Sequence, residues 1–97
     1  MKVNLYATFR LIADTRTLEL DLPAGTTVRE LVTCVVERLP VLRPHWLDEQ
    51  GHLHAHVHIL YRGDDIATLP LGLDTPLPAD AAVDIFPPVA GGCGQEG

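Results

Sequence analysis

Two successive glycines, Gly91 and Gly92, are the residues whose type and spacing point most directly to chemistry. Glycine has no Cβ and loses the most backbone entropy on folding, so a glycine pair that follows an apolar strand has no rationale in folding. A thin, extended backbone can instead enter a narrow active site of another protein and present its carbonyl there. The alternative is an ordinary frayed terminus, since glycine-rich termini are common.

Four histidines at alternate positions are a second candidate, His52, His54, His56 and His58. On a strand, which we expect over residues 54–61, these imidazoles would share one face, and two or three could hold a zinc or copper ion. A flat row cannot supply four ligands at tetrahedral angles without bending, and the same pattern suits the polar outer face of a half-buried strand. We therefore predict no metal site. The alternative is a metal site formed by these four histidines.

Nucleophilic catalysis finds little support in the sequence. Such enzymes need a serine, cysteine or lysine beside a base, but the chain has no serine and one lysine, Lys2. Cys93 is the one thiol expected to be exposed, and nothing holds it in fixed geometry to a base. Cys34 lies on the flank of a predicted helix, and we expect it to be a small packed residue. We expect a protein that is not an enzyme and binds no cofactor itself.

The composition describes one soluble globular domain. Of 97 residues, 46% are hydrophobic and 21% are charged, which is ordinary for a folded chain of this size. A net charge of −6 argues against a phosphate-binding surface, so no nucleic-acid partner is expected. No apolar stretch is long enough to span a bilayer and no signal-peptide layout begins the chain, so we expect no membrane partner, a cytoplasmic location and reduced cysteines.

Period-two alternation predicts the strands. It predicts a strand over residues 2–11 with the odd positions facing the core, and a second over 16–22 that pairs with it as a β-hairpin. Further strands are predicted at 54–61, 66–68 and 82–86, with a turn at Arg62-Gly63-Asp64-Asp65.

A helix is predicted between the second and third strands. Thr27 followed by Glu30 forms a capping-box pattern, and Pro40 ends the run. Its apolar stripe at helical spacing is Val28, Leu31, Val32, Val35, Val36 and Leu39. One amphipathic helix must bury its stripe on one face of a sheet, which predicts a two-layer α+β domain. The element order is that of the β-grasp, or ubiquitin-like, fold, with a mixed sheet of four to five strands on one main helix. We expect this domain over residues 1–90 and a flexible tail over 91–97.

Four segments follow the pattern of a known family, namely Thr27-Val28-Arg29-Glu30-Leu31, residues 61–66, residues 72–77 and residues 83–92. With them the chain resembles the MoaD/ThiS family of ubiquitin-like sulfur carriers over nearly its whole length to Gly92. The most specific piece is the ending Pro87-Pro88-Val89-Ala90-Gly91-Gly92, because it stands directly after the last strand of a β-grasp pattern.

The resemblance implies a mechanism in which partner enzymes perform the catalysis. A ubiquitin-activating-type adenylyltransferase uses ATP to adenylate the carboxylate of Gly92. A persulfide from a sulfurtransferase or cysteine desulfurase then converts it to a thiocarboxylate, which donates its sulfur to a biosynthetic enzyme. Gly91 has no side chain, so the backbone at this position can pass through a narrow channel of the partner. The residues leading to the glycines are expected to contact that partner, namely Phe86, Pro87, Pro88, Val89 and Ala90.

The sequence departs from the family pattern after the second glycine. Cys93-Gly94-Gln95-Glu96-Gly97 follows Gly92, so Gly92 has no free carboxylate as encoded. The resemblance implies that a zinc-dependent, deubiquitinase-like metalloprotease cleaves between Gly92 and Cys93. A non-catalytic β-grasp binding module, or a small subunit of a heteromeric enzyme whose tail inserts into a partner, is the alternative function.

Overall fold

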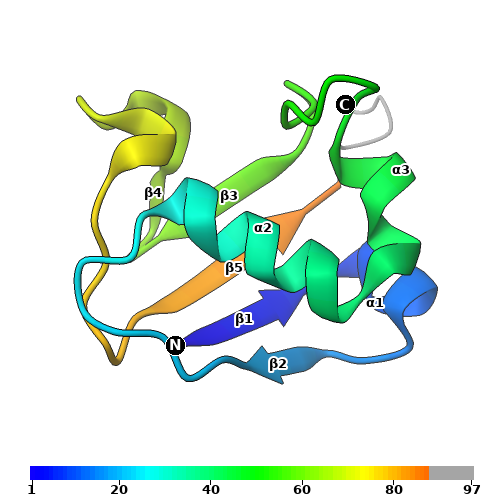
Figure 1. Cartoon of the computed structure of the whole chain (residues 1–97), viewed down its shortest axis with the longest axis horizontal. Helices are drawn as coiled ribbons and strands as arrows, with labels where there is room; N and C mark the ends of the chain where they lie inside the picture. The colour runs from blue at the N-terminus through cyan, green and yellow to red at the C-terminus, as the bar shows by residue number, and fades with distance from the viewer. Residues whose placement is uncertain (88–97) are drawn as a thin grey trace.

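A five-stranded mixed sheet with one long helix across one face forms the body of the chain in the computed structural model, which describes residues 1–87 (Figure 1). The strands are β1 (Lys2–Leu5), β2 (Thr17–Glu19), β3 (His58–Tyr61), β4 (Asp64–Asp65) and β5 (Ala82–Phe86). The helices are α1 (Ala7–Ala13), α2 (Val28–Arg38) and α3 (Arg43–Trp46), and 3₁₀ turns lie at Pro40–Leu42, Ile66–Thr68 and Gly72–Asp74. This confirms the predicted two-layer α+β class.

The first and last strands pair in parallel at the centre of the sheet. The strand order is β2-β1-β5-β3-β4, and only the β1–β5 pair is parallel among these strands. Val3 lies opposite Val83 and Leu5 opposite Ile85, and all four side chains are buried. The first and last strands of the described chain are therefore held side by side in the core of the domain, with Lys2 beside the start of β5.

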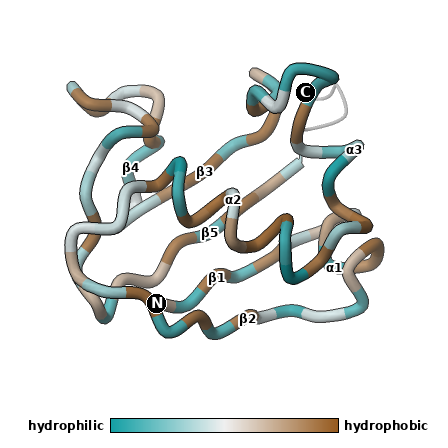
Figure 2. Tube along the Cα trace, viewed as in Figure 1, coloured by the Kyte–Doolittle hydropathy of each residue, from teal (hydrophilic) through white to brown (hydrophobic). Residues whose placement is uncertain are grey.

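Helix α2 forms where the capping box predicts it. The Thr27 hydroxyl accepts a hydrogen bond from the Glu30 backbone N–H at 3.2 Å, and the Glu30 carboxylate accepts one from the Thr27 N–H at 2.9 Å. Five members of the predicted stripe are buried, Val28, Leu31, Val32, Val35 and Val36. Hydrophobic residues recur along α2 and along the central strands (Figure 2). Their buried side chains form one core between the helix and the face of the sheet that it covers.

The predicted strand over residues 2–11 is wrong beyond Leu5. Ala7 takes a positive φ of 53°, which turns the backbone out of the strand and into α1. Phe9, Ile12 and Ala13 pack against the core at helical spacing, whereas Leu11 is 73% exposed. A short segment with apolar residues at both spacings cannot be assigned by period alone, and burial of Phe9 favours the helix.

The other element boundaries are partly corrected. β2 covers Thr17–Glu19 of the predicted 16–22, and it pairs antiparallel with β1, although α1 replaces the short hairpin turn. β3 begins at His58 instead of residue 54. The predicted strand at 66–68 is a 3₁₀ turn, because the Asp65 carboxylate accepts the Ala67 N–H and caps it. β5 matches 82–86.

The turn predicted at residues 62–65 is present as the connection between β3 and β4. Arg62 and Gly63 have φ values of 55° and 84°, the left-handed pair that a tight two-residue hairpin turn requires. Within residues 1–87, no helix is long and apolar enough to cross a membrane.

A pair of substitutions in α1 tests its helical geometry. Phe9 is buried edge-on against Trp46, with ring centroids 5.6 Å apart, so Phe9→Ala should lower the free energy of unfolding by about 3–5 kcal/mol. Leu11→Ala should change it by less than about 0.5 kcal/mol, because that side chain is exposed. Urea denaturation of both variants checks this. Equal losses would instead indicate a strand with both residues facing the core.

Candidate functional site

The face of the sheet opposite α2 carries a polar cluster on its two central strands. We call this side the open face; it bears Asn4 and Asp84, which lie opposite each other across the β1–β5 pair. The Asn4 amide donates to Asp84 Oδ1 at 2.9 Å, and the Thr17 hydroxyl of β2 donates to Asn4 Oδ1 at 3.1 Å. A chain of side-chain hydrogen bonds therefore links three adjacent strands.

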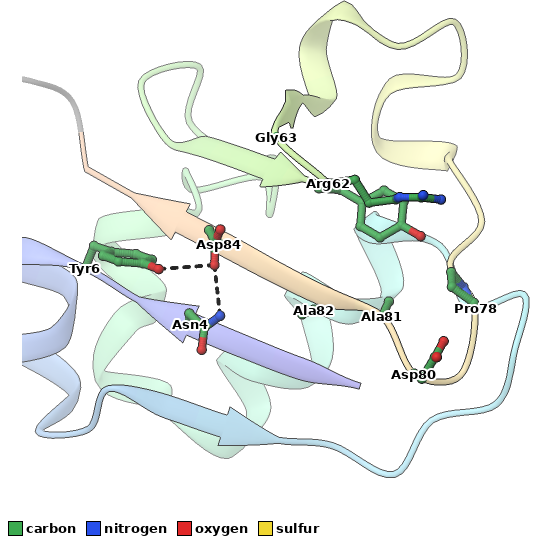
Figure 3. Close-up of a pocket in the computed structure, with 10 residues that line it drawn as sticks. Asn4, Tyr6, Arg62, Gly63, Pro78, Asp80, Ala81, Ala82 and Asp84 are labelled. Atoms are coloured by element: carbon green, nitrogen blue, oxygen red, sulfur yellow. Dashed lines mark hydrogen bonds between the residues drawn. The ribbon is translucent and has the colours of Figure 1, made fainter.

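Tyr6 joins this cluster to the end of β5. Its ring stacks on Phe86 with centroids 4.3 Å apart and planes 10° from parallel. The Tyr6 hydroxyl donates to Asp84 Oδ1 at 3.3 Å (Figure 3). The stack lies on the last residue of β5, immediately before Pro87, so the aromatic pair marks the point where the chain leaves the sheet.

The surroundings of Tyr6 in this cluster shift the pKa of its phenol. Partial burial, the negative charge of Asp84 and the hydrogen bond to Asp84 together raise the pKa of Tyr6 above its ordinary value. The neutral phenol is thus the favoured form, and its hydroxyl donates to Asp84 Oδ1.

A hollow of about 610 Å³ opens on this face beside the polar cluster (Figure 3). Asn4, Tyr6 and Asp84 line one side of it, and Arg62 and Asp80 contribute further charges. Its mixed charged and aromatic lining suits a polar surface of another macromolecule and provides no closed chamber for a small reactant.

The predicted partner-binding segment is described only at its beginning. Phe86 and Pro87 are half-buried at the end of β5. The remaining predicted residues lie outside the described range, namely Pro88, Val89, Ala90, Gly91, Gly92 and Cys93. The roles of Gly91 and Gly92, the cleavage after Gly92 and the domain boundary at residue 90 therefore stay predictions.

The histidine row does not form the face that the sequence predicts. Only His58 lies in β3, while His52, His54 and His56 lie in the connection before it, where the Val57 N–H bonds the His54 carbonyl in a turn. The rings of His54 and His56 stack with centroids 4.8 Å apart. Among residues 1–87, no group of three or more histidine, cysteine, aspartate or glutamate side chains is placed to hold a metal ion.

Acidic side chains organise the two ends of this histidine segment. The Asp48 carboxylate accepts the backbone N–H groups of Gln50 and His52, each at 2.9 Å. The bond from His52 is the main cause that lowers the pKa of Asp48. His58 Nδ1 lies 3.9 Å from an Asp65 carboxylate oxygen. These contacts stabilise the two ends of the histidine segment in its folded conformation.

Sequence reasoning missed the cluster of Asn4, Tyr6 and Asp84. Alternation placed Asn4 and Tyr6 on an outer face, which is correct, but nothing in one sequence shows that β1 and β5 are neighbours. A usable signal was Tyr6 itself, a large aromatic on the polar side of a strand pattern.

A family model matches almost the whole described sheet and continues to the second glycine. The model is the ThiS family, and it matches residues 3–92. The chain belongs to the ThiS family. It is thereby a member of the ubiquitin-like sulfur carriers and modifiers, and the match stops at Gly92.

Named relatives and solved structures agree with this family. The chain is 30% identical over 92 residues to small archaeal modifier protein 1 of Haloferax volcanii, covering 95% of this chain and 100% of that protein. The solution structure of small archaeal modifier protein 1 from Methanosarcina acetivorans is 31% identical, with a TM-score of 0.79 and 94% of each chain covered.

A third match comes from Pyrococcus furiosus. A putative molybdopterin converting factor, subunit 1, from Pyrococcus furiosus is 28% identical, with a TM-score of 0.68, covering 91% of this chain and 95% of that chain. The structural matches confirm the β-grasp, ubiquitin-like fold expected from the order of elements.

A pH titration tests the coupling between Tyr6 and Asp84. In a Tyr61→Phe background, where Tyr6 is the remaining tyrosine, tyrosinate absorbance should give a pKa above 10, and Asp84→Asn should lower it part of the way back. Because the folded pKa is raised, the stabilisation from Tyr6 is complete below about pH 10 and is lost as pH rises through the folded pKa. An unchanged pKa in Asp84→Asn would contradict the contact.

Proposed function

We propose that this chain is a sulfur carrier precursor whose reactive group is the carboxylate of Gly92 once the residues after it have been removed. The observation that carries the proposal is the extent of the family match, which runs through Gly92 and leaves Cys93 and the residues after it outside. The glycine pair also follows β5 in the sequence, a central strand that is paired with β1, and this position supports the same proposal.

The chain contributes the acyl group, and its partners contribute the catalysis. An adenylyltransferase of the ubiquitin-activating type joins the Gly92 carboxylate to AMP from ATP and releases pyrophosphate. A persulfide, supplied by a sulfurtransferase or cysteine desulfurase, displaces AMP, and reductive cleavage of its S–S bond by a thiol leaves the thiocarboxylate. A biosynthetic enzyme then accepts the sulfur. Gly91 and Gly92 lack Cβ atoms that would obstruct entry to an active-site channel.

The residues beyond Gly92 keep the carrier latent. An internal amide has no carboxylate to adenylate, so cleavage of the Gly92–Cys93 bond must come first. A zinc-dependent metalloprotease of the deubiquitinase-like type is the proposed processing enzyme, and small residues on both sides of the bond ease access for it.

The open face supplies the docking surface for the activating partner. The Tyr6–Phe86 stack stands where the chain leaves the sheet, so a partner that holds this pair also receives the segment that follows. An aromatic pair with a hydrogen-bonded polar tip is typical of the residues that dominate protein interfaces. The excess of acidic residues favours a partner with a basic surface.

One relative favours a second function. The Pyrococcus furiosus relative is a putative subunit of a converting factor, which fits a β-grasp subunit that inserts its tail into a larger protein. Such a subunit would bind its partner without being adenylated.

Two chain lengths separate these functions. With a ThiS-type activating enzyme, ATP and a sulfur source, a chain that ends at Gly92 should gain the mass of sulfur minus oxygen, as measured by intact mass spectrometry. The chain of residues 1–97 is the matched control and should keep its mass, because its Gly92 has no carboxylate. A Gly92-ended chain that binds the enzyme but never releases pyrophosphate would contradict the carrier function.

Alanine substitutions test the docking surface. Tyr6→Ala and Phe86→Ala should each raise the carrier concentration that half-saturates the activating enzyme roughly tenfold, the effect of losing an interface anchor. Leu71→Ala is the control, because Leu71 is 60% exposed yet lies in a connection away from β5. Pyrophosphate release measures all three. Equal effects at Leu71 and Phe86 would exclude a localised docking site.

A further inference from the structure

Strand β2 forms one edge of the sheet, and within residues 1–87 no other strand lies on its outer side (Figure 1). We propose that this edge is a docking site for an extended segment of a partner protein, which adds a strand to the sheet and alternates basic with apolar residues. Strand addition to a free sheet edge is a recurring mode of peptide recognition. The proposal is independent of the proposed function, because it uses neither the hollow on the open face nor the residues after Pro87.

The hydrogen bonds between β1 and β2 use alternate residues of β2. The Leu5 N–H donates to the Arg16 carbonyl at 2.7 Å, and the Leu20 N–H donates to the Met1 carbonyl at 2.8 Å. Leu18 lies midway between Arg16 and Leu20 in the same register and belongs to the same set. The backbone groups of residues 16, 18 and 20 are therefore directed at β1.

Thr17 and Glu19 alternate with this set, so their N–H and C=O groups point away from β1. The Thr17 carbonyl accepts the Thr15 hydroxyl at 3.2 Å. In the described part of the chain, the Thr17 N–H and both backbone groups of Glu19 have no other hydrogen-bond partner. Both residues are exposed. The outer side of β2 therefore offers backbone donors and acceptors at the spacing that an added strand needs.

The opposite edge of the sheet is less suited to strand addition. β4 has two residues, Asp64 and Asp65, and the chain then enters the 3₁₀ turn Ile66–Thr68. The Asp65 carboxylate accepts the Ala67 N–H at 2.9 Å and stabilises this turn. Because the extended backbone ends so soon, an added strand would find few partners at β4. The edge that can accept a strand is therefore β2.

Side chains along β2 define the chemistry of the occupant. Glu19 and Asp21 are exposed, and in the part of the chain that the structure describes they make no ion pair, although Lys2 lies opposite Glu19. Leu18 and Leu22 alternate with them and are half-buried against the core. Opposite charges on neighbouring strands stabilise their pairing. The matching segment therefore places lysine or arginine beside Glu19 and Asp21, and its apolar residues on the side of the two leucines.

The same charges disfavour a second copy of the chain as the occupant. Pairing of two β2 edges would gather Glu19 and Asp21 of both copies on one face of the joined sheet, and each chain has a net charge of −6. Short, charged edge strands are a common means of preventing self-association through sheets. The two carboxylates therefore repel a second copy and attract a basic strand.

Proline substitutions test which backbone groups of β2 are free. Glu19→Pro removes an N–H that points outward, and it should leave the urea midpoint of unfolding close to that of the unmodified chain, because proline is tolerated where its nitrogen faces solvent. Leu18→Pro removes an N–H directed at β1 and should lower the midpoint strongly. Equal losses in the two variants would overturn the assignment of the free edge.

Hydrogen exchange of single amides tests the docking. The probe is the end-blocked peptide Lys-Val-Lys-Val-Lys-Val-Lys, and its matched control carries glutamate in place of each lysine. The lysine peptide should slow exchange at the Thr17 and Glu19 amides at least about tenfold, with little change at Leu18, which already bonds β1. The glutamate peptide should change none of them. Absence of protection by the lysine peptide, or equal protection by both peptides, would overturn the proposal.

Charge variants of the chain test the match between the edge and its occupant. Glu19→Gln combined with Asp21→Asn keeps the side-chain shapes and should weaken binding of the lysine peptide at least about tenfold. Glu19→Pro should remove the peptide's protection of the Thr17 amide. Unchanged affinity in the double variant would overturn the charge match. Protection of the same amides without peptide, together with a doubled mass in light scattering, would show a second copy at this edge and would also overturn the proposal.

Discussion

Parallel pairing of β1 with β5 is the interaction on which the rest of the structure depends. It joins the first and last strands through Val3, Val83, Leu5 and Ile85, all buried under α2. Because both strands are central, β2 pairs with β1 and β3 pairs with β5, and β4 is attached through β3. The same pairing fixes the point where the chain leaves the sheet at Phe86, directly before the segment that is proposed to react.

The open face follows from this pairing. Asn4 and Asp84 meet there only because β1 and β5 are neighbours in register, and Tyr6 reaches Phe86 for the same reason. The proposed docking residues and the end of β5 are therefore parts of one unit. In the proposed reaction a partner recognises this unit, and the domain contributes no catalytic side chain of its own.

Sequence patterns predicted the parts of the fold governed by local rules. Thr27, Glu30 and the stripe after them predicted α2, and Pro87-Pro88 predicted the end of β5. They failed at Ala7–Ala13, where seven residues satisfy both periods and tertiary burial of Phe9 decides, and at His52–His56, where the backbone turns before the strand begins. The Asn4–Asp84 contact could not be predicted, because its partners are 80 residues apart in the chain.

In the proposed function Gly92 becomes the reactive terminus after the residues beyond it are removed. Intact mass spectrometry of the protein purified from its native host is the decisive measurement. We expect a chain shortened by the mass of residues 93–97, part of it carrying sulfur in place of one oxygen. A population that keeps residues 93–97 entirely, in cells where the partner enzymes are active, would contradict it.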